Sequence, residues 1–326
     1  MCCEKRISVV VCTYNGARYL REQLDSILAQ DYQPVEIIVQ DDGSSDDTFH
    51  ILEEYAHIYQ LIKVFRNEGR HGINNNFFSA MQRASGDYIA LADQDDIWEH
   101  DKLYRQAEAI GEKLLCSGFS VPFSDDGFPV GHDDRMPNYD ILRLAYLGVL
   151  PGHTLLMHRS LPDYVPNKNN CPYLYDWQLQ MVAAAAESIV FVPHVLVHFR
   201  RHGDAATACL PVGHCMISSS AINYIQTTLL HHAALQRCVR TRFSYILQML
   251  DELPFKTKAV EECREMARLQ LQSGLKGFVK RTVFFLQHQT QLFHVTEKKS
   301  LLTACRALYF PFSCGYYYRA ILKQHK

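Results

Sequence analysis

The first hundred residues alternate between two hydrophobic periods, and this alternation constrains the fold more than any other feature. Four short apolar runs are typical of strands buried on both faces: residues 7–12, 35–40, 62–65 and 88–92. Three intervening segments repeat apolar side chains every three or four positions, as amphipathic helices do: residues 17–30, 48–57 and 76–84. Strand–helix alternation predicts parallel strands joined by right-handed crossovers, and hence an open, mostly parallel, Rossmann-like α/β sheet.

Polar clusters follow three of these predicted strands at the point where each strand ends. They are Thr13–Asn15, Asp41–Asp42 and Asp93–Asp96. In open α/β sheets, ligands bind in the crevice outside the carboxyl ends of the strands. We therefore expect the three clusters to lie at one ligand site.

The third cluster places Asp93, Asp95 and Asp96 within four residues. Neighbouring carboxylates repel one another unless a cation lies among them. Hard oxygen ligands without a nearby cysteine suit Mg²⁺ or Mn²⁺, and Mg²⁺ is usually shared with substrate phosphates, which predicts a nucleoside diphosphate as co-ligand. The alternative is a solvated turn that caps a helix starting near Asp101. Asp42 has two interpretations as well, because its carboxylate can accept the N3–H of uracil or thymine or can cap the turn that follows it.

Charge and missing motifs exclude several classes of protein. The formal net charge of −2 argues against a general nucleic-acid binder. No G-x-G-x-x-G follows the first strand, which argues against a dinucleotide dehydrogenase, and no P-loop is present.

Three motifs in order give the chain a family resemblance. VVVCTYNGARYLREQLDSILAQ, VEIIVQDDGSSDDT and GDYIALADQDDIW together resemble an inverting family-2 glycosyltransferase of the GT-A fold, over about residues 7–102 with weaker similarity to about residue 203. The form ADQDDIW is similar to the rhamnosyltransferase-like branch of that family. The resemblance implies a nucleoside diphosphate sugar donor, dTDP-rhamnose or a UDP-sugar, and a glycan or lipid-linked glycan acceptor in cell-surface polysaccharide synthesis.

The resemblance also implies a donor and metal site. Asp95 would bind Mg²⁺ or Mn²⁺, Asp93 would contact the ribose or the metal, and Asp42 would bind the pyrimidine base. The remaining implied donor-binding residues are Thr13, Tyr14, Asn15 and Asn76, and Arg201 is a further candidate because its guanidinium could pair with phosphate. A late histidine, His202, would complete the metal or diphosphate site, and the small-residue loop Pro151–Thr154 would lie under the acceptor.

A general base is needed for the acceptor hydroxyl in an inverting transfer. Asp176, which opens a helical stretch before Trp177, is similar to the base of the family. A cap for the same helix is an alternative role that is compatible with the first. Arg200 and Arg201, which directly precede His202, could pair with phosphate or form a solvated basic turn.

After about residue 117 the sequence pattern allows fewer predictions of structure. Gly, Pro and Asp throughout residues 117–138 indicate a loop, residues 188–193 and 195–199 indicate two strands, and residues 229–250 and 260–275 indicate helices. We expect a GT-A domain over residues 1–205 and a helical C-terminal region over 206–326. The eleven scattered cysteines, without a CxxC pair, and the lack of a signal or membrane-spanning segment predict a cytoplasmic protein.

Basic residues alternate with aromatic residues in two segments of the tail, 274–285 and 305–326. This pattern indicates either peripheral membrane contact at the inner face of the cytoplasmic membrane or an ordinary helical subdomain. Two alternatives to a glycosyltransferase stay open: a sugar-nucleotide pyrophosphorylase, and a catalytically inactive nucleotide-binding scaffold. The first would normally carry a Gly-rich basic loop after the first strand, which CTYNGARY does not supply. The presence of all the predicted site carboxylates, Asp42, Asp93, Asp95 and Asp176, argues against the inactive scaffold.

Overall fold

The structure is a computed structural model of the chain. It describes residues 5–128, 130–131, 135–146, 148–203 and 232–293, with isolated positions 304 and 307. The chain divides into two compact units. Unit 1 comprises residues 1–128, 150–183 and 188–202, and unit 2 comprises residues 129–149, 184–187 and 203–326.

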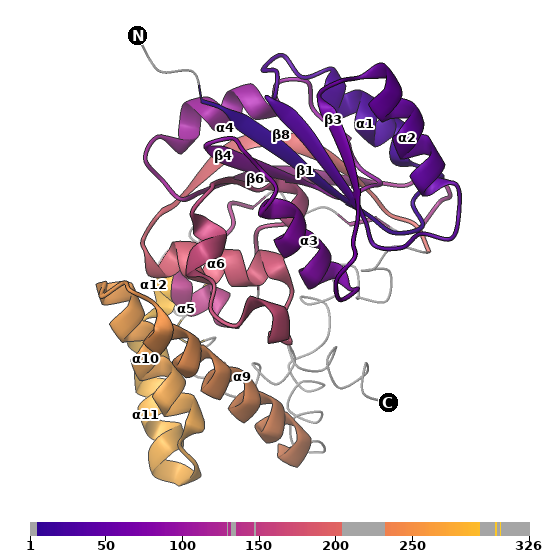
Figure 1. Ribbon diagram of the computed structural model, residues 1–326. Coiled ribbons are helices and arrows are strands. Elements are labelled where there is room, and N and C mark those ends of the chain that lie inside the picture. The colour runs from indigo at the N-terminus through magenta and orange to yellow at the C-terminus, as the bar shows by residue number, and fades with distance from the viewer. Residues whose placement is uncertain are drawn as a thin grey trace. The chain divides into compact units, whose positions relative to one another are not determined.

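Unit 1 contains one eight-stranded sheet with the order β3-β2-β1-β4-β7-β6-β8-β5 (Figure 1). The strands are β1 (Ile7–Thr13), β2 (Glu36–Asp41), β3 (Ile62–Arg66), β4 (Tyr88–Ala92), β5 (Ile97–Trp98), β6 (Leu115–Phe123), β7 (Leu156–His158) and β8 (Ile189–Arg200). The first four predicted strands are confirmed, and they pair in parallel with β1 between β2 and β4. Only β5 and β7 run antiparallel to their neighbours, so the expected mostly parallel sheet is confirmed.

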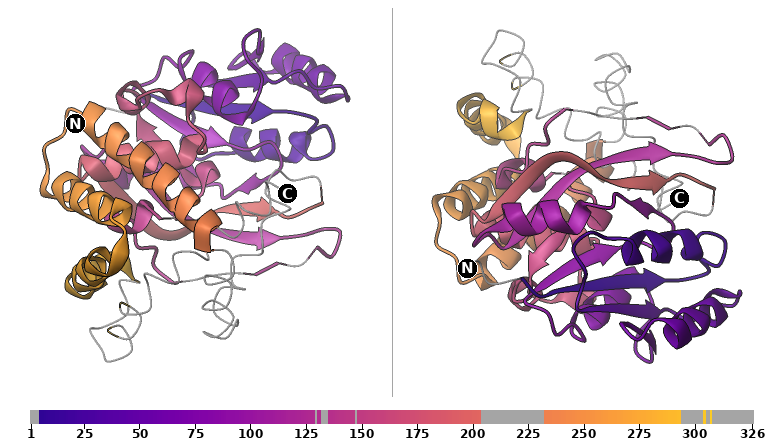
Figure 2. Two further views of the ribbon diagram at one scale, coloured as in Figure 1. Left: turned by 90° about the horizontal axis from the view of Figure 1, so that it is seen from below. Right: turned by 90° about the horizontal axis from the view of Figure 1, so that it is seen from above.

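Helices cover both faces of this sheet, as the views in Figures 1 and 2 show. On one face lie α1 (Leu20–Leu28), α2 (Thr48–Ile58) and α4 (Lys102–Ile110), and on the other lie α3 (Ile73–Met81) and α6 (Tyr175–Ala185). Alternate residues of β1 point to opposite faces, and Ile7, Val9 and Val11 join a fully buried cluster with Leu20 and Leu24 of α1. Both faces are buried, which explains why β1 and β2 are apolar without alternation.

Two sequence predictions were wrong in the second half of unit 1. Residues 117–123 were expected in a loop but belong to β6, and the two strands expected at 188–199 are one continuous strand, β8. Both errors have the same cause, because β6 and β8 pair with each other in parallel. A Cβ atom on Gly118 would lie 2.4 Å from the Leu196 side chain, so this glycine permits close strand packing and does not mark a turn.

Unit 2 is helical in its described residues. It contains α5 (Ile141–Leu144), α9 (His232–Glu252), α10 (Lys258–Leu271), α11 (Gly274–Gln287) and α12 (Gln289–Leu292). The predicted helices near 229–250 and 260–275 correspond to α9 and α10, and α10 packs against α9, α11 and α5. Within the described ranges, no helix is both long enough and apolar enough to cross a bilayer.

Candidate active site

The loop between β4 and β5 carries the three predicted carboxylates and is fixed to the loop after β1. Gln94, between Asp93 and Asp95, accepts a hydrogen bond from the backbone N–H of Tyr14 (2.7 Å) and donates one to its carbonyl (3.0 Å). A Cβ atom on Gly16 would lie 2.3 Å from the Gln94 side chain, so a larger residue here would displace Gln94 from this position. The carboxyl ends of β1 and β4 are thereby joined at one place, as the sequence predicted.

The three carboxylates then diverge in burial and partners. The side chain of Asp93 is 41% exposed, whereas that of Asp96 is 3% exposed. Asp96 accepts a hydrogen bond through Oδ1 from the backbone N–H of Arg200 (3.1 Å), and its buried Oδ2 accepts none from the described residues. Burial is the main reason that the pKa of Asp96 is raised to about 8, although the positive charge of His153 opposes the shift.

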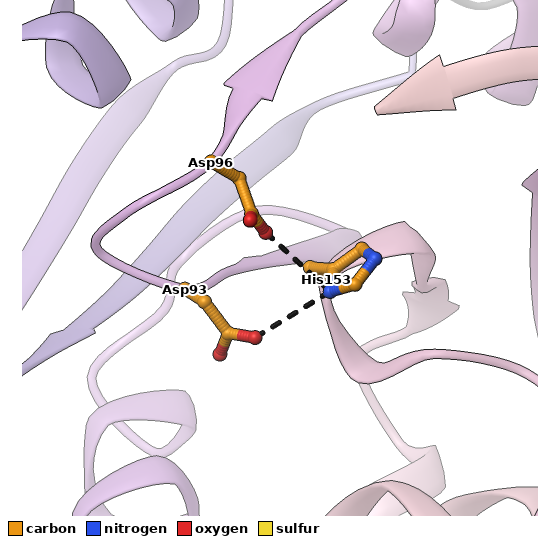
Figure 3. A group of neighbouring side chains, drawn as sticks. All are labelled: Asp93, Asp96 and His153. Carbon is orange, nitrogen blue, oxygen red and sulfur yellow. Dashed lines mark ion pairs between the residues drawn. The ribbon is translucent and has the colours of Figure 1, made fainter. Parts of the chain in front are cut away.

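His153 brings the first and last of these acids together, as Figure 3 shows. Its Nδ1 lies 3.5 Å from Asp93 Oδ2 and 3.4 Å from Asp96 Oδ2, and the three side chains could hold a metal ion. Burial lowers the pKa of His153, but the charges of Asp96 and Asp93 outweigh it and raise that pKa. The imidazole ring stacks on Phe199 at 5.4 Å between centroids, and its buried Nε2 has no hydrogen-bond partner within the described ranges.

Asp95 has a separate partner. Its Oδ2 lies 2.9 Å from Nε2 of His202, so the structure brings together two residues that the sequence predicted as metal ligands. The ring of His202 packs against Tyr19 at 4.8 Å, and its buried Nδ1 has no partner among the described residues. The acidic loop therefore offers two carboxylate–histidine groups side by side: Asp95 with His202, and Asp93 and Asp96 with His153.

Arg200 fixes this loop from the protein interior. Its Nε donates to the carbonyl of Asp95 (3.0 Å), and its guanidinium lies between the rings of Tyr19 and Phe123. The same guanidinium pairs with Glu22 (2.5 Å) and with Asp125. The phosphate-binding role considered for Arg200 was therefore wrong, because its side chain is 3% exposed and is already paired with carboxylates.

Arg201 is also buried, at 8% exposure. Its backbone N–H donates to the carbonyl of Phe123 (2.8 Å), and its guanidinium lies 5.4 Å from the ring of Phe128. Donor binding by Arg201 stays a prediction that would require this side chain to reach the diphosphate.

The carboxylate of Asp42 lies at the end of β2 and is held by the loop after β3. Asn67 Nδ2 donates to Oδ1 (2.6 Å), the backbone N–H of Gly72 donates to Oδ2 (2.7 Å), and His71 Nδ1 lies 3.1 Å from Oδ1. The neighbouring Asp41, and not Asp42, caps the turn that follows β2, because it accepts the N–H groups of Gly43 and Ser44. The capping alternative for Asp42 is therefore wrong for this turn.

The residues predicted to line the nucleotide pocket fall into two groups. Tyr14 is 58% exposed, and Asn15 adopts a left-handed conformation (φ 49°) while its Oδ1 accepts the N–H of Ser45. Thr13 is buried, and its hydroxyl donates a hydrogen bond to Asp41 (2.9 Å). Asn76 is 3% exposed, and its amide exchanges hydrogen bonds with the side chain and carbonyl of Gln40, so the structure does not bring it to the acidic loop.

Asp176 lies in the first turn of α6, next to the loop that carries His153. A Cβ atom on Gly152 would lie 2.4 Å from the Tyr175 hydroxyl and 3.4 Å from Asp176 Cβ, so the missing side chain lets this loop meet the helix. Asp176 Oδ1 accepts the N–H of Trp177 (2.7 Å). Burial raises the pKa of Asp176 to about 6, and the negative charge of Asp93 adds to the shift.

Sequence reasoning missed two members of this site. The sequence places Asp96 in the acidic cluster without a distinct ligand role, and it places His153 only within the small-residue loop Pro151–Thr154. A histidine within a short buried segment that enters a strand was the available signal. Its proximity to acids nearly sixty residues earlier follows from the pairing of β4 with β7.

The sheet order, the helices on both faces and the polar cluster at the carboxyl ends of β1, β2 and β4 define a protein of the GT-A type. Solved structures agree on the fold: S. aureus TarS 1-349 in complex with UDP-GlcNAc superposes with a TM-score of 0.53 at 17% identity over 98% of this chain and 91% of that chain. The mannosyltransferase PcManGT of Pyrobaculum calidifontis, in complex with GDP-Man and Mn²⁺, gives 0.51 at 17% identity over 99% and 87%.

Sequence comparisons place the chain in a family. The family model Glycosyl transferase family 2 matches residues 8–161. An uncharacterized glycosyltransferase of Haemophilus influenzae is 41% identical over 223 residues, which are 62% of this chain and 67% of the relative. The chain therefore belongs to glycosyltransferase family 2.

Two further relatives extend this picture. The putative teichuronic acid biosynthesis glycosyltransferase TuaG of Bacillus subtilis is 34% identical over 170 residues, which are 50% of this chain and 66% of the relative. An uncharacterized protein of Mycobacterium tuberculosis is 30% identical over 207 residues, and this chain spans 59% of its length. Family membership argues against the pyrophosphorylase alternative.

Proposed function

We propose that this chain transfers a sugar, with inversion, from a nucleoside diphosphate sugar to a hydroxyl group of a glycan or lipid-linked glycan in cell-surface polysaccharide synthesis. The observation that carries the proposal is the acidic loop after β4, where two carboxylate–histidine groups lie next to a partly buried carboxylate, Asp176. The name of the relative TuaG supports a polysaccharide acceptor. On this proposal, residues 1–205 form the catalytic domain and residues 206–326 a helical C-terminal region.

The donor nucleotide would lie across the carboxyl ends of β1 and β2. The Asp42 carboxylate, oriented by Asn67 and Gly72, would accept the N3–H of a pyrimidine. Tyr14 and Asn15 would line the pocket, with Thr13 beneath them. We leave Asn76 out of this pocket because its amide already bonds to Gln40.

The divalent cation, Mg²⁺ or Mn²⁺, would be held by Asp95 and His202, with Asp93 as the more exposed neighbour that meets the ribose or the cation. At this site the buried Nδ1 of His202 has no hydrogen-bond partner among the described residues, which fits a group that is completed by a ligand. A cation bound there would neutralise charge on the departing diphosphate. PcManGT, which has a similar fold, was solved in complex with GDP-Man and Mn²⁺, and this supports a cation of this kind.

Asp176 would accept the proton of the acceptor hydroxyl. A general base works best when its pKa lies near the working pH, and burial raises the pKa of Asp176 to about 6. Above that pH the carboxylate is ionised and can take the proton. Gly152 lets the loop that bears His153 pack closely against Asp176.

A release assay tests the function. Purified full-length chain is incubated with UDP-, dTDP- and GDP-sugars and Mn²⁺, with and without glycan acceptors, and the free nucleoside diphosphate is measured. We expect release from a pyrimidine donor that requires Mn²⁺, and dTDP-rhamnose is the first donor to try on the strength of ADQDDIW alone. No release from any donor, together with nucleotide binding, would favour the inactive scaffold.

A pair of variants tests the choice of ligands. His202→Gln should weaken Mn²⁺-dependent UDP binding about tenfold or more, because a metal ligand is lost. The matched control, His153→Gln, changes the other carboxylate–histidine group and should have a smaller effect. The reverse order would assign the cation to Asp93, Asp96 and His153.

A further inference from the structure

Helix α11 of unit 2 has one side that is firmly anchored to its neighbour. Phe284 and Phe285 are buried, and a Cβ atom on Gly277 would lie 3.0 Å from Gln272, so glycine lets the helix approach the end of α10. Arg281 Nη1 donates to the carbonyl of Leu269 (3.1 Å) and to that of Gln272 (2.5 Å) at the C-terminus of α10. The orientation of α11 relative to α10 is therefore fixed by several contacts.

A different side of the same helix exposes an apolar stripe. Leu275, Val279 and Val283 are 79%, 51% and 46% exposed. Because residues four apart lie on one side of a helix, the three side chains form a continuous line. Single exposed apolar residues are ordinary, but an aligned set on an anchored helix indicates a contact surface.

Positive charge borders this stripe. Lys276 and Lys280 each follow a stripe residue by one position, and both are exposed. Neither forms an ion pair with a carboxylate of the described residues, whereas the third base, Arg281, is committed to α10. The sequence of α11, GLKGFVKRTVFFLQ, contains no acidic residue.

We propose that the stripe of Leu275, Val279 and Val283 docks on a lipid surface that contains anionic headgroups. An amphipathic helix with apolar side chains beside lysines lies in the membrane interface, where apolar burial and attraction to anionic lipids both contribute. This inference extends beyond sugar transfer and does not depend on it. It gives the predicted peripheral membrane contact a defined place, α11.

Charge argues against two other occupants. A second copy of α11 would bring the same lysines face to face with no acid on the helix to compensate them. Segments 204–231 and 294–326 of the chain contain two acidic residues, Asp204 and Glu297, against six bases: Lys298, Lys299, Arg306, Arg319, Lys323 and Lys326. Neither occupant complements the positive stripe as an anionic lipid surface does.

Vesicle co-sedimentation of the full-length chain tests the proposal. We expect binding to vesicles of phosphatidylcholine with phosphatidylglycerol, weaker binding to phosphatidylcholine alone, and loss with added salt. The double variant Leu275→Ser with Val279→Ser should reduce partitioning by about tenfold or more, because two apolar contacts are lost. The control Ile58→Ser removes an apolar residue from α2 whose exposure (67%) lies between those of Leu275 and Val279, and it should leave partitioning unchanged.

A charge variant and a reporter make the test specific to α11. Lys276→Gln and Lys280→Gln should each weaken partitioning about fivefold, whereas Lys256→Gln, another exposed lysine of unit 2, should change it less. Since Trp98 and Trp177 are buried (4% and 5% exposed), a Leu275→Trp variant should show a blue shift with anionic vesicles that comes from α11. Unchanged partitioning of the double variant, or no blue shift, would overturn the proposal. A wild-type dimer that is measured by analytical ultracentrifugation and is lost in the double variant would also overturn it, because the stripe would then contact a second copy.

Discussion

Two buried carboxylates at opposite ends of the same mostly parallel sheet have opposite environments. Glu36, at the amino end of β2, accepts hydrogen bonds from Ser8 (2.7 Å), from Lys63 (2.6 Å) and from both the backbone and hydroxyl of Ser85 (2.6 and 2.7 Å). Burial alone would raise the pKa of Glu36, but these donors outweigh burial and lower that pKa to about 2. Asp96, beyond the carboxyl end of β4, has one hydrogen bond and a pKa raised to about 8 by burial.

The comparison shows at which end of the sheet the buried polar atoms have hydrogen-bond partners within the protein and at which end some of them have none. At the amino end, every oxygen of the buried acid has a partner, so its charge stabilises the sheet. At the carboxyl end, carboxylates and histidines crowd together with unpaired buried atoms, which costs stability in the free protein. Such a cost is typical of a site whose ligand supplies the missing partners.

The largest expected effect comes from a change at the carboxyl end of the sheet, and it is an effect on catalysis. Asp176→Asn should lower the transfer rate about 10³-fold, because an amide cannot accept the acceptor proton. In the wild-type chain the rate should fall as pH drops below about 6, where Asp176 becomes protonated. Rates measured from pH 5 to 8 check both points, and a variant that keeps full transfer activity would contradict the assigned base.

The next effect is on stability at the satisfied end. Glu36→Gln should lower the free energy of unfolding by about 2–3 kcal/mol, because the ion pair with Lys63 is lost and a hydroxyl or N–H donor loses its acceptor. Asp96→Asn is the matched change at the other end and should leave stability equal or higher. Urea unfolding at pH 7 without metal measures both, and equal losses for the two variants would refute the contrast.

A smaller effect is expected at Arg200, which holds the acidic loop through the carbonyl of Asp95. Arg200→Lys keeps the charge but loses the planar group that lies between Tyr19 and Phe123 and bonds to the Asp95 carbonyl. We expect Mn²⁺-dependent nucleotide affinity to fall about tenfold while binding at saturating Mn²⁺ partly recovers. An affinity for Mn²⁺ equal to that of the wild type would show that Arg200 does not position the loop.

The smallest effect is the pH dependence of stability in the metal-free chain. Folded Asp96 holds its proton up to about pH 8, and the unfolded carboxyl loses it near pH 4, so the Asp96 contribution falls as pH rises between those values. Glu36 acts in the opposite sense, because its stabilisation is present above about pH 4.5 and is lost as pH falls toward 2.

Urea titrations from pH 4.5 to 8 measure the free energy of unfolding of the Asp96→Asn variant and of the wild type. As pH rises, this free energy should increase in the variant relative to the wild type by about 1 kcal/mol or more. The raised pKa of His153 acts in the same direction, because its stabilising charge is lost as pH rises through that pKa. A gap between the two proteins that does not change with pH would contradict the assigned environment of Asp96.

Local patterns were sufficient to predict the first half of the sheet. The strands and crossover helices of residues 7–92 pair with near neighbours in the chain, so periodicity and turn residues contained the needed information. The pairing of β6 with β8 joins Leu115 to Ile189, and no local signal reveals that partner. Residues such as Gly118 and Pro122 then indicated a loop, although they lie in a strand between two others.

The site divides in the same way. The acids of the loop after β4 were predicted because they follow a recognisable strand. His153 and Arg200 lie far along the chain from the acidic loop, Arg200 by 105 residues from Asp95, and only the folded sheet brings them to the loop. For Asn76, the motif could not show that its amide is occupied by Gln40, a residue on the neighbouring strand.

The central claim is that the acidic loop holds a divalent cation together with the donor diphosphate. Calorimetric titration of the full-length chain with UDP and with dTDP, each with and without Mn²⁺, tests it most directly. We predict binding that requires Mn²⁺ and disappears in Asp95→Ala but persists in Asp47→Ala, an exposed acid in the turn before α2. Nucleotide binding that is equally strong without Mn²⁺, or that survives Asp95→Ala unchanged, would contradict the account.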